Sequence, residues 1–162
     1  DRSFTHDWRD AVNAVLVLGT GGAAHSVISA ITAQGKKAYV LGRSVVSAAR
    51  LASEFELAEL YSNQAAELIV NCTPLGLNGE DALSAFCVLP AFEYAFDLVY
   101  SDALTPFLRR CRNNGSKVAD GADMLVYQAI EGDKILLKRD FDVEAVYKTA
   151  VDILKSDGVL RG

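Results

Sequence analysis

The chain has 162 residues, of which 51% are hydrophobic and 23% charged, and its formal net charge is −5. This length and composition are typical of one globular domain, and they exclude collagen-like, low-complexity and disordered chains. The acidic balance argues against a general nucleic-acid binder, and no apolar run is long enough to span a bilayer.

We expect no secretory signal, because Asp1-Arg2-Ser3 is not a basic start followed by an apolar run. The absence of an initiator Met suggests a fragment, a processed product or a truncated chain. We therefore expect a protein of the cytoplasm that neither binds nucleic acid nor enters a membrane.

The cysteines and histidines are too few for the common metal or disulfide frameworks. Cys72, Cys87 and Cys111 are odd in number, and no two have the C-x-x-C spacing. Three free, mostly buried thiols in a reducing compartment is the interpretation we prefer. With only His6 and His25 present, a three-histidine metal site is impossible. We predict no metal site.

The predicted elements alternate between strands and helices. The apolar run 14–18 indicates a strand buried on both faces, followed by a glycine turn over 19–22 and a helix that ends near Gly35. Ser44 is placed to cap a helix whose apolar stripe reaches Phe55. Further strands are expected over 38–41, 57–61, 68–70, 95–99 and 117–119, and further helices over 105–113, from 124 onward and over 143–154.

This order predicts βαβ units and hence a parallel sheet. The fold class we expect is α/β, a Rossmann-like doubly wound parallel sheet of about six strands with C-terminal helices. We expect residues 1–162 to form a single domain, with only 78–90 loosely patterned. Ligands of such sheets bind beyond the carboxyl ends of the strands, so the residues after each strand are the site candidates.

The first of these segments, Gly19-Thr20-Gly21-Gly22-Ala23-Ala24, fits the pattern G-x-G-x-x-A. Its glycines allow a tight turn and close approach of the backbone to a pyrophosphate, and the following helix N-terminus offers free N–H groups to the phosphates. Its place between a buried strand and an amphipathic helix strengthens the prediction of a dinucleotide. A glycine turn without ligand, or a different nucleotide such as S-adenosylmethionine, is the alternative.

The second segment, Gly42-Arg43-Ser44, points to NADP. A site selective for NAD usually places Asp or Glu near here for the ribose hydroxyls, and the nearest downstream carboxylate is Glu54. Arg43 instead offers a cation with planar donors, and Ser44 adds a hydroxyl, which together suit a 2′-phosphate. The alternative is a solvated surface arginine.

Three more segments follow strands: Asn71-Cys72-Thr73-Pro74-Leu75-Gly76-Leu77, then Asp97-Leu98-Val99-Tyr100 with Thr105-Pro106-Phe107-Leu108, then the run 120–128 (DGADMLVYQ). Behind the glycine turn and in this order, they resemble the motifs of the shikimate dehydrogenases. The resemblance runs from about Ala14 to Gln128. It implies the family's C-terminal Rossmann-like NADP-binding domain, with the family's N-terminal shikimate-binding domain not represented.

The resemblance assigns roles to particular residues. By the resemblance, the glycine turn meets the pyrophosphate, and Arg43 and Ser44 hold the 2′-phosphate. The segment 72–74 lines the dinucleotide, and Leu98, Gly121 and Met124 shape the nicotinamide pocket. The predicted cofactor-binding set is Gly19, Thr20, Gly21, Gly22, Ala23, Gly42, Arg43, Ser44, Cys72, Thr73, Pro74, Leu98, Gly121 and Met124. Tyr100 and Gln128 match the two residues that this domain lends to the substrate, shikimate or 3-dehydroshikimate.

The sequence also departs from the family pattern. His25 stands where the family often has Arg, Gly42 replaces Asn, and Ser47 lies where a second basic residue is frequent. One cation instead of two predicts a weaker preference for NADP. The family's catalytic Lys and Asp belong to its N-terminal domain, so we assign no catalytic residue to this chain and expect it to bind cofactor only.

Two further functions remain open on the sequence. A quinate dehydrogenase or another paralogue is possible, since the residues that separate quinate from shikimate lie largely outside this domain. A non-catalytic dinucleotide-sensing module is the other, with the helix over 143–154 as its docking face. The sequence does not predict an oligomeric state.

Overall fold

The computed structural model describes residues 8–86, 89–101, 103–138, 140 and 142–156. It divides into two compact units, Asp1–Asp120 and Gly121–Gly162. Each unit is described by itself below.

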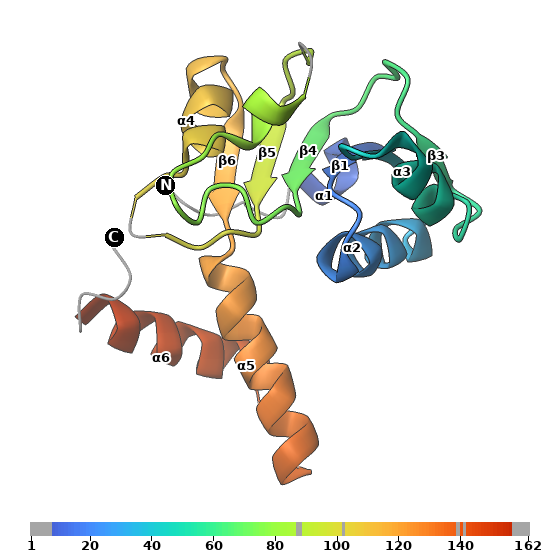
Figure 1. The fold of residues 1–162 in the computed structure, drawn as a ribbon. Coiled ribbons are helices and arrows are strands. Elements are labelled where there is room, and N and C mark those ends of the chain that lie inside the picture. Colours follow the sequence, from blue (N-terminus) through green and yellow to red (C-terminus); the bar gives the residue numbers. More distant parts are fainter. Residues whose placement is uncertain (1–7, 87–88, 102, 139, 141, 157–162) are drawn as a thin grey trace. The chain divides into compact units, whose positions relative to one another are not determined.

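The first unit contains one six-stranded sheet in which every pairing is parallel (Figure 1). The strand order is β3-β2-β1-β4-β5-β6, so the direction of strand addition reverses between β1 and β4. The strands are β1 (Ala14–Leu18), β2 (Lys37–Leu41), β3 (Ala58–Leu60), β4 (Leu68–Asn71), β5 (Tyr94–Asp97) and β6 (Lys117–Asp120). The predicted α/β, Rossmann-like sheet is confirmed.

The helices of the first unit are α1 (Trp8–Ala11), α2 (Gly22–Ala33), α3 (Val45–Ala52), the 3₁₀ helix η1 (Ala82–Ala85) and α4 (Pro106–Asn113). Three of them, α2, α3 and α4, begin where the sequence predicts them, whereas α1 and η1 were not predicted. The Ser44 side chain caps α3 by accepting the N–H of Ser47, and Thr105 caps α4 by accepting the N–H of Leu108. These side chains satisfy backbone donors that helix starts leave unpaired.

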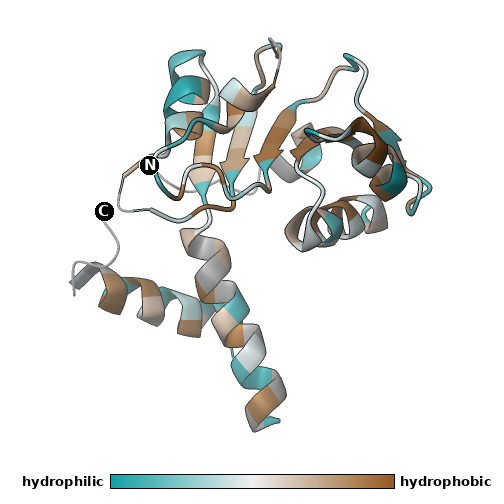
Figure 2. Cartoon of the chain, viewed as in Figure 1, coloured by the Kyte–Doolittle hydropathy of each residue, from teal (hydrophilic) through white to brown (hydrophobic). Residues whose placement is uncertain are grey.

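The core lies on both faces of the sheet. Val15 and Val17 of β1 belong to one buried cluster, which includes residues of α2 and α3. Leu16 and Leu18 belong to a second cluster, which includes Phe107 of α4. Successive side chains of a strand point to opposite faces, so helices cover both sides of β1. Figure 2 shows the strands as mostly hydrophobic and the outer helices as mixed, as this doubly wound arrangement requires.

Two segments differ from the sequence-based expectation. β5 ends at Asp97 rather than at Val99, because the Asp97 carboxylate accepts the N–H of Val99 at 3.0 Å and turns the chain out of the sheet. The segment expected to be loose contains η1, capped where Asp81 accepts the N–H of Leu83 at 2.9 Å.

The second unit contains α5 (Ala122–Leu137) and α6 (Val143–Ser156), which contact each other. The apolar stripe predicted over 143–154 thus lies on a helix with a partner inside its own unit. In the part of the chain that the structure describes, no helix is both long and apolar enough to cross a membrane. Cys72 and Cys111 are free and buried, as expected, whereas Cys87 and His6 lie outside the described residues.

Candidate functional site

The carboxyl ends of five strands lie at one edge of the sheet. In the parallel register Leu18 of β1 pairs with Leu41 of β2 and with Asn71 of β4. Asn71 in turn pairs with Asp97 of β5, which pairs with Asp120 of β6. The segments that follow these strands are therefore brought together. By the general rule for such sheets, a ligand is expected in a crevice beyond this edge, where the strand order reverses between β1 and β4.

Gly19 holds the glycine turn against the loop after β4. Its φ of +113° lies in a region that residues with a Cβ rarely adopt. A Cβ at this position would also approach the carbonyl oxygen of Cys72 to 3.1 Å. The Gly19 N–H donates to the Leu41 carbonyl at 2.8 Å, so the turn is tied to β2 as well.

The N-terminus of α2 is open to a ligand. Gly21 is its N-cap, and no side chain accepts a hydrogen bond from the first turn, which also contains no acidic residue. Gly21 and Gly22 are exposed, and a Cβ on either would have no atom within 4 Å. The free N–H groups and the positive end of the helix dipole favour an anion at this place.

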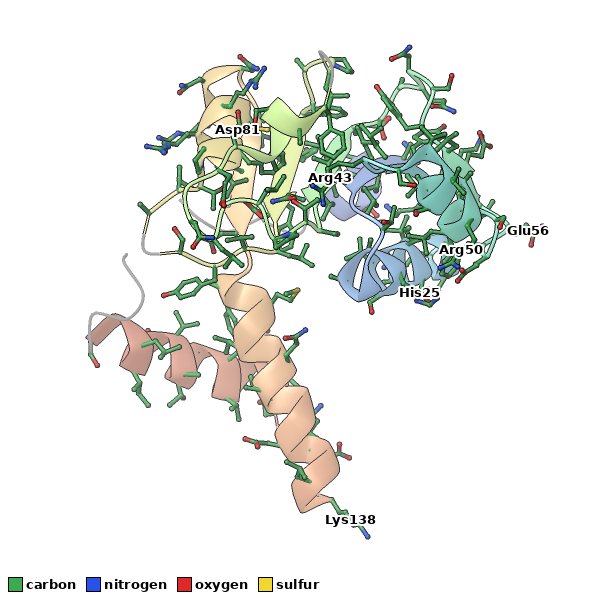
Figure 3. All side chains as sticks on the ribbon, in the orientation of Figure 1. His25, Arg43, Arg50, Glu56, Asp81 and Lys138 are labelled. Carbon is green, nitrogen blue, oxygen red and sulfur yellow. The ribbon has the colours of Figure 1, made fainter. Side chains whose placement is uncertain are left out.

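The end of β2 presents the predicted phosphate-binding residues. A Cβ on Gly42 would approach the Cγ2 of Thr20 to 2.7 Å, so Gly42 lets the two turns lie close together. Arg43 and Ser44 are exposed beyond it. Figure 3 shows Arg43 apart from His25 and Arg50.

A buried hydrogen-bond network supports the loop after β4. Asn71 is fully buried, and its Nδ2 donates to Asp97 Oδ1 at 2.9 Å and to the Leu75 carbonyl at 3.0 Å. Its Oδ1 accepts the Thr73 N–H at 3.0 Å and the Thr73 hydroxyl at 2.6 Å. The side chain of Asn71 thereby fixes the predicted cofactor-lining residues Cys72, Thr73 and Pro74 next to Gly19.

Asp97 completes the network from the neighbouring strand. Its Oδ2 accepts the Thr105 hydroxyl at 2.6 Å, and its Oδ1 accepts the Val99 N–H. Burial raises the pKa of Asp97, and the hydrogen bonds from Thr105, Val99 and Asn71 oppose that rise. Burial, together with the charge of Asp97, raises the pKa of the Cys72 thiol to about 12. The thiol of Cys72 is therefore uncharged at physiological pH.

Asn71, Asp97 and Thr105 belong to the motifs of the sequence, which predicts Thr105 as a helix cap but no role for Asn71 or Asp97. The sequence signal for the Asn71–Asp97 pair was that each of two buried strands, β4 and β5, ends in a polar residue. Their pairing joins positions 26 residues apart, from Asn71 to Asp97, which no local pattern reveals.

The remaining predicted residues fall in two places. Leu98 and Tyr100 follow β5 at the same edge, and both are half-buried. Gly121, the N-cap of α5, belongs to the second unit together with Met124 and Gln128. The binding roles of these three residues stay predictions.

His25, the departure from the family pattern on α2, faces the segment after α3. Its Nε2 lies 3.4 Å from Glu54 Oε2, and its ring meets Phe55 edge to face with centroids 5.0 Å apart. Within the described ranges no group of three or more His, Cys, Asp or Glu side chains is arranged to hold a metal ion.

Comparison with known proteins points to one family. No protein-family model matches the chain. It is 38% identical over 133 residues to a shikimate dehydrogenase (NADP(+)) of Sinorhizobium medicae, a match that covers 76% of this chain and 46% of that protein. A shikimate dehydrogenase (NADP(+)) of Methanocella arvoryzae is 31% identical in a match that covers 94% of this chain and 65% of that protein.

Solved structures agree with these relatives. A shikimate dehydrogenase of Aquifex aeolicus aligns with a TM-score of 0.70 and 29% identity, over 86% of this chain and 53% of that one. The Thermus thermophilus shikimate 5-dehydrogenase, solved with NADP(H) and shikimate, gives a TM-score of 0.70 and 32% identity over 85% of this chain and 54% of that one.

The chain spans about half the length of the curated relatives that it matches most strongly, 46% in the first of them. These relatives and solved structures are shikimate dehydrogenases, and the chain matches the C-terminal part of them.

Proposed function

We propose that the chain is the NADP-binding part of a shikimate dehydrogenase, an enzyme that reversibly reduces 3-dehydroshikimate to shikimate with NADPH. The observation that carries this proposal is the open N-terminus of α2 beside an exposed Arg43 at one edge of the sheet. The N–H groups of α2 suit a pyrophosphate, and Arg43 suits a second, separate phosphate.

The described residues fit a dinucleotide phosphate. Gly21 and Gly22 leave open space where side chains would otherwise stand, and the first turns of α2 and α3 contain no acidic residue to repel phosphates. In this proposal Gly19, Thr20, Gly21, Gly22 and Ala23 hold the pyrophosphate. Gly42, Arg43 and Ser44 hold the adenosine ribose and its 2′-phosphate.

The nicotinamide half of the proposed site is built from later segments. Cys72, Thr73 and Pro74 line the dinucleotide, held in place through Asn71, and Leu98 contributes to the nicotinamide pocket. We propose Gly121 and Met124 for the same pocket, and Tyr100 and Gln128 as residues that bind the substrate. When bound, NADPH supplies the hydride, and the protein positions the nicotinamide against the substrate carbon while excluding water.

We assign no catalytic residue to this chain. The matched region corresponds to the C-terminal part of the relatives, so we propose that a substrate-binding domain preceding this part in the whole protein supplies the groups that move the hydroxyl proton. The protein's small-molecule partners in this proposal are NADP and shikimate or 3-dehydroshikimate. We propose a cytoplasmic location and no nucleic-acid partner.

The test of this function is Arg43→Ala, with Arg50→Ala as the matched control on the same helix layer. Arg43 has no hydrogen-bond or ion-pair partner in the described part of the chain, so its removal leaves the fold intact. Loss of a charge-assisted bond to the 2′-phosphate should weaken NADP⁺ binding about 10- to 100-fold.

Calorimetric titration with NADP⁺ and NAD⁺ measures this selectivity. We expect NAD⁺ binding by the Arg43→Ala chain, and binding of both cofactors by the Arg50→Ala chain, to change by less than about twofold, because surface charges distant from a ligand contribute little. Equal losses of NADP⁺ and NAD⁺ affinity in Arg43→Ala would argue that Arg43 does not read the 2′-phosphate.

A further inference from the structure

Asp97 is a buried acidic side chain whose charge has no task in the proposed function. Its side chain is fully buried at the carboxyl end of β5. In the part of the chain that the structure describes, no lysine or arginine forms an ion pair with it. Burying a carboxylate without a cation is unfavourable, and a neutral asparagine could accept the same N–H groups. The charge of Asp97 therefore calls for an explanation of its own.

The hydrogen bonds around Asp97 fit its ionised form. Oδ1 accepts the Val99 N–H at 3.0 Å and the Asn71 Nδ2 amide at 2.9 Å. The orientation of the Asn71 amide is fixed, because its oxygen accepts the backbone N–H of Thr73. Oδ2 lies 2.6 Å from the Thr105 hydroxyl. These hydrogen bonds favour a carboxylate and oppose the rise in the pKa of Asp97 that burial causes.

This charge lies next to the segments that we propose to line the nicotinamide. Asn71 and Asp97 are paired at the ends of β4 and β5, which are neighbours in the sheet (Figure 1). Cys72 and Leu98, both in the proposed cofactor-binding set, directly follow them in the chain. The charge of Asp97 acts on Cys72, since it contributes to the raised pKa of that thiol. Because Asn71, Cys72 and Asp97 are all buried, water screens this charge only weakly.

The two redox forms of the cofactor differ in charge at the nicotinamide ring. The ring is positively charged in NADP⁺ and neutral in NADPH, whereas the phosphates, the riboses and the adenine are the same in both. A nearby negative charge therefore stabilises the oxidised form alone, and it does so more strongly where water is excluded. Packing and hydrogen bonds at the rest of the cofactor act on both forms alike.

We propose that the Asp97 carboxylate favours the oxidised, positively charged nicotinamide over the reduced, neutral one, and so sets the relative affinity of the chain for NADP⁺ and NADPH. This inference rests on the proposed NADP-binding function. Because Asp97 is fully buried, it acts through its charge and not by exposing an atom to the ligand. The hydrogen bonds from β4, from Val99 and from Thr105 hold that charge in place.

The test is Asp97→Asn in the 162-residue chain. Asparagine has nearly the same shape; its oxygen can accept from Val99 and Asn71, and its amide can donate to the Thr105 oxygen. The substitution thus removes the charge and keeps the hydrogen bonds. Calorimetric titration gives the dissociation constants for NADP⁺ and NADPH. We expect the first to rise about three- to tenfold, the scale of a partly screened unit charge at an effective dielectric constant of about 20, and the second to change by less than about twofold.

Two control variants separate the charge from its surroundings. Glu67→Gln removes a carboxylate at the opposite end of the sheet, where it accepts N–H groups at the start of β1, so the ratio of the two affinities should not change. Thr105→Val keeps the charge of Asp97 but removes one of its hydrogen bonds and the cap of α4. For Thr105→Val we expect a lower melting temperature, with any loss of affinity equal for NADP⁺ and NADPH.

A second measurement needs no substitution, and it decides the matter even if Asp97→Asn does not fold. The NMR chemical shift of the isotopically labelled carboxyl carbon of Asp97 reports whether the group is ionised. We expect the ionised form at neutral pH in the unaltered chain. A carboxyl that is protonated at neutral pH has no charge to act on the nicotinamide, and this result overturns the proposal.

The binding results separate this inference from the function on which it rests. An unchanged ratio of NADP⁺ to NADPH affinity in Asp97→Asn overturns the electrostatic role. Equal losses for the two forms also overturn it, because they show that the residue acts through the shape of the site. An unaltered chain that binds neither form overturns the proposed function and this inference together, whereas the first two results leave the proposed function standing.

Discussion

The residues at the carboxyl edge of the sheet form two groups, one structural and one exposed to a ligand. Asn71 and Asp97 are fully buried and use their polar atoms on neighbouring protein groups. Gly21, Arg43 and Ser44 are exposed and leave donors for a ligand. The first group sets the shape of the crevice, and the second determines what binds there.

Glu67 shows how one side chain supports the opposite end of the sheet. Its Oε2 accepts the N–H groups of Asn13 at 3.0 Å and Ala14 at 2.9 Å, where β1 begins. Burial alone would raise the pKa of Glu67, but these backbone hydrogen bonds and the nearby Lys36 outweigh it, so the pKa is lowered. The ionised form is therefore the one that stabilises the fold.

Glu67→Gln should lower the free energy of unfolding near neutral pH by about 1 kcal/mol, because a neutral oxygen replaces a charged acceptor. Since the folded-state pKa lies below the unfolded one, the carboxylate's contribution is fully present above the ordinary value of about 4.3 and is lost as the pH falls through the lowered value. Urea unfolding at several pH values measures the difference between the two proteins. A difference that stays constant as the pH falls from neutral to about 3 would contradict this assignment.

At the scale of elements, the pattern of apolar residues predicts the six strands and the helix starts well. The strands stand out as buried runs of β-forming residues bounded by turns. Ser44 and Thr105 mark helix starts, because both residue types are favoured as N-caps. The early end of β5 and the Asn71–Asp97 pair were not predictable in this way. Both arise from side-chain hydrogen bonds, and the second depends on two strands becoming neighbours in the sheet.

The hydrogen bonds that hold the loop after β4 can be removed by a single substitution of Asn71. Asn71→Ala would leave the Thr73 N–H and hydroxyl, the Leu75 carbonyl and one Asp97 oxygen without this partner. Stranding such buried groups should destabilise the protein by about 2–4 kcal/mol. Unlike Arg43→Ala, this change should weaken NADP⁺ and NAD⁺ binding together, since the loop would line the part common to both cofactors.

Chemical denaturation and cofactor titration of the Asn71→Ala chain check both effects. Thr32→Ala serves as a comparison, because its hydroxyl bonds only within α2, at the Ile28 and Ser29 carbonyls. A loss confined to NADP⁺, or full stability without Asn71, would mean that the network does not hold the loop.

For the whole molecule, similarity to known proteins says more about function than the architecture of the sheet does. A doubly wound sheet hosts many functions, whereas the relatives of similar sequence are shikimate dehydrogenases. The resemblance to these enzymes and the parallel sheet were both predictable from the sequence. The roles proposed for Gly121, Met124 and Gln128 of the second unit stay predictions.

The most direct test of the account is calorimetric titration of the 162-residue chain with NADP⁺ and, separately, with NAD⁺. The open turn of α2 and the pair Arg43–Ser44 predict saturable binding of both, with NADP⁺ at least about tenfold tighter, the scale of one charge-assisted hydrogen bond. Tighter binding of NAD⁺, or no binding of either cofactor, would contradict the assignment of this crevice as an NADP site.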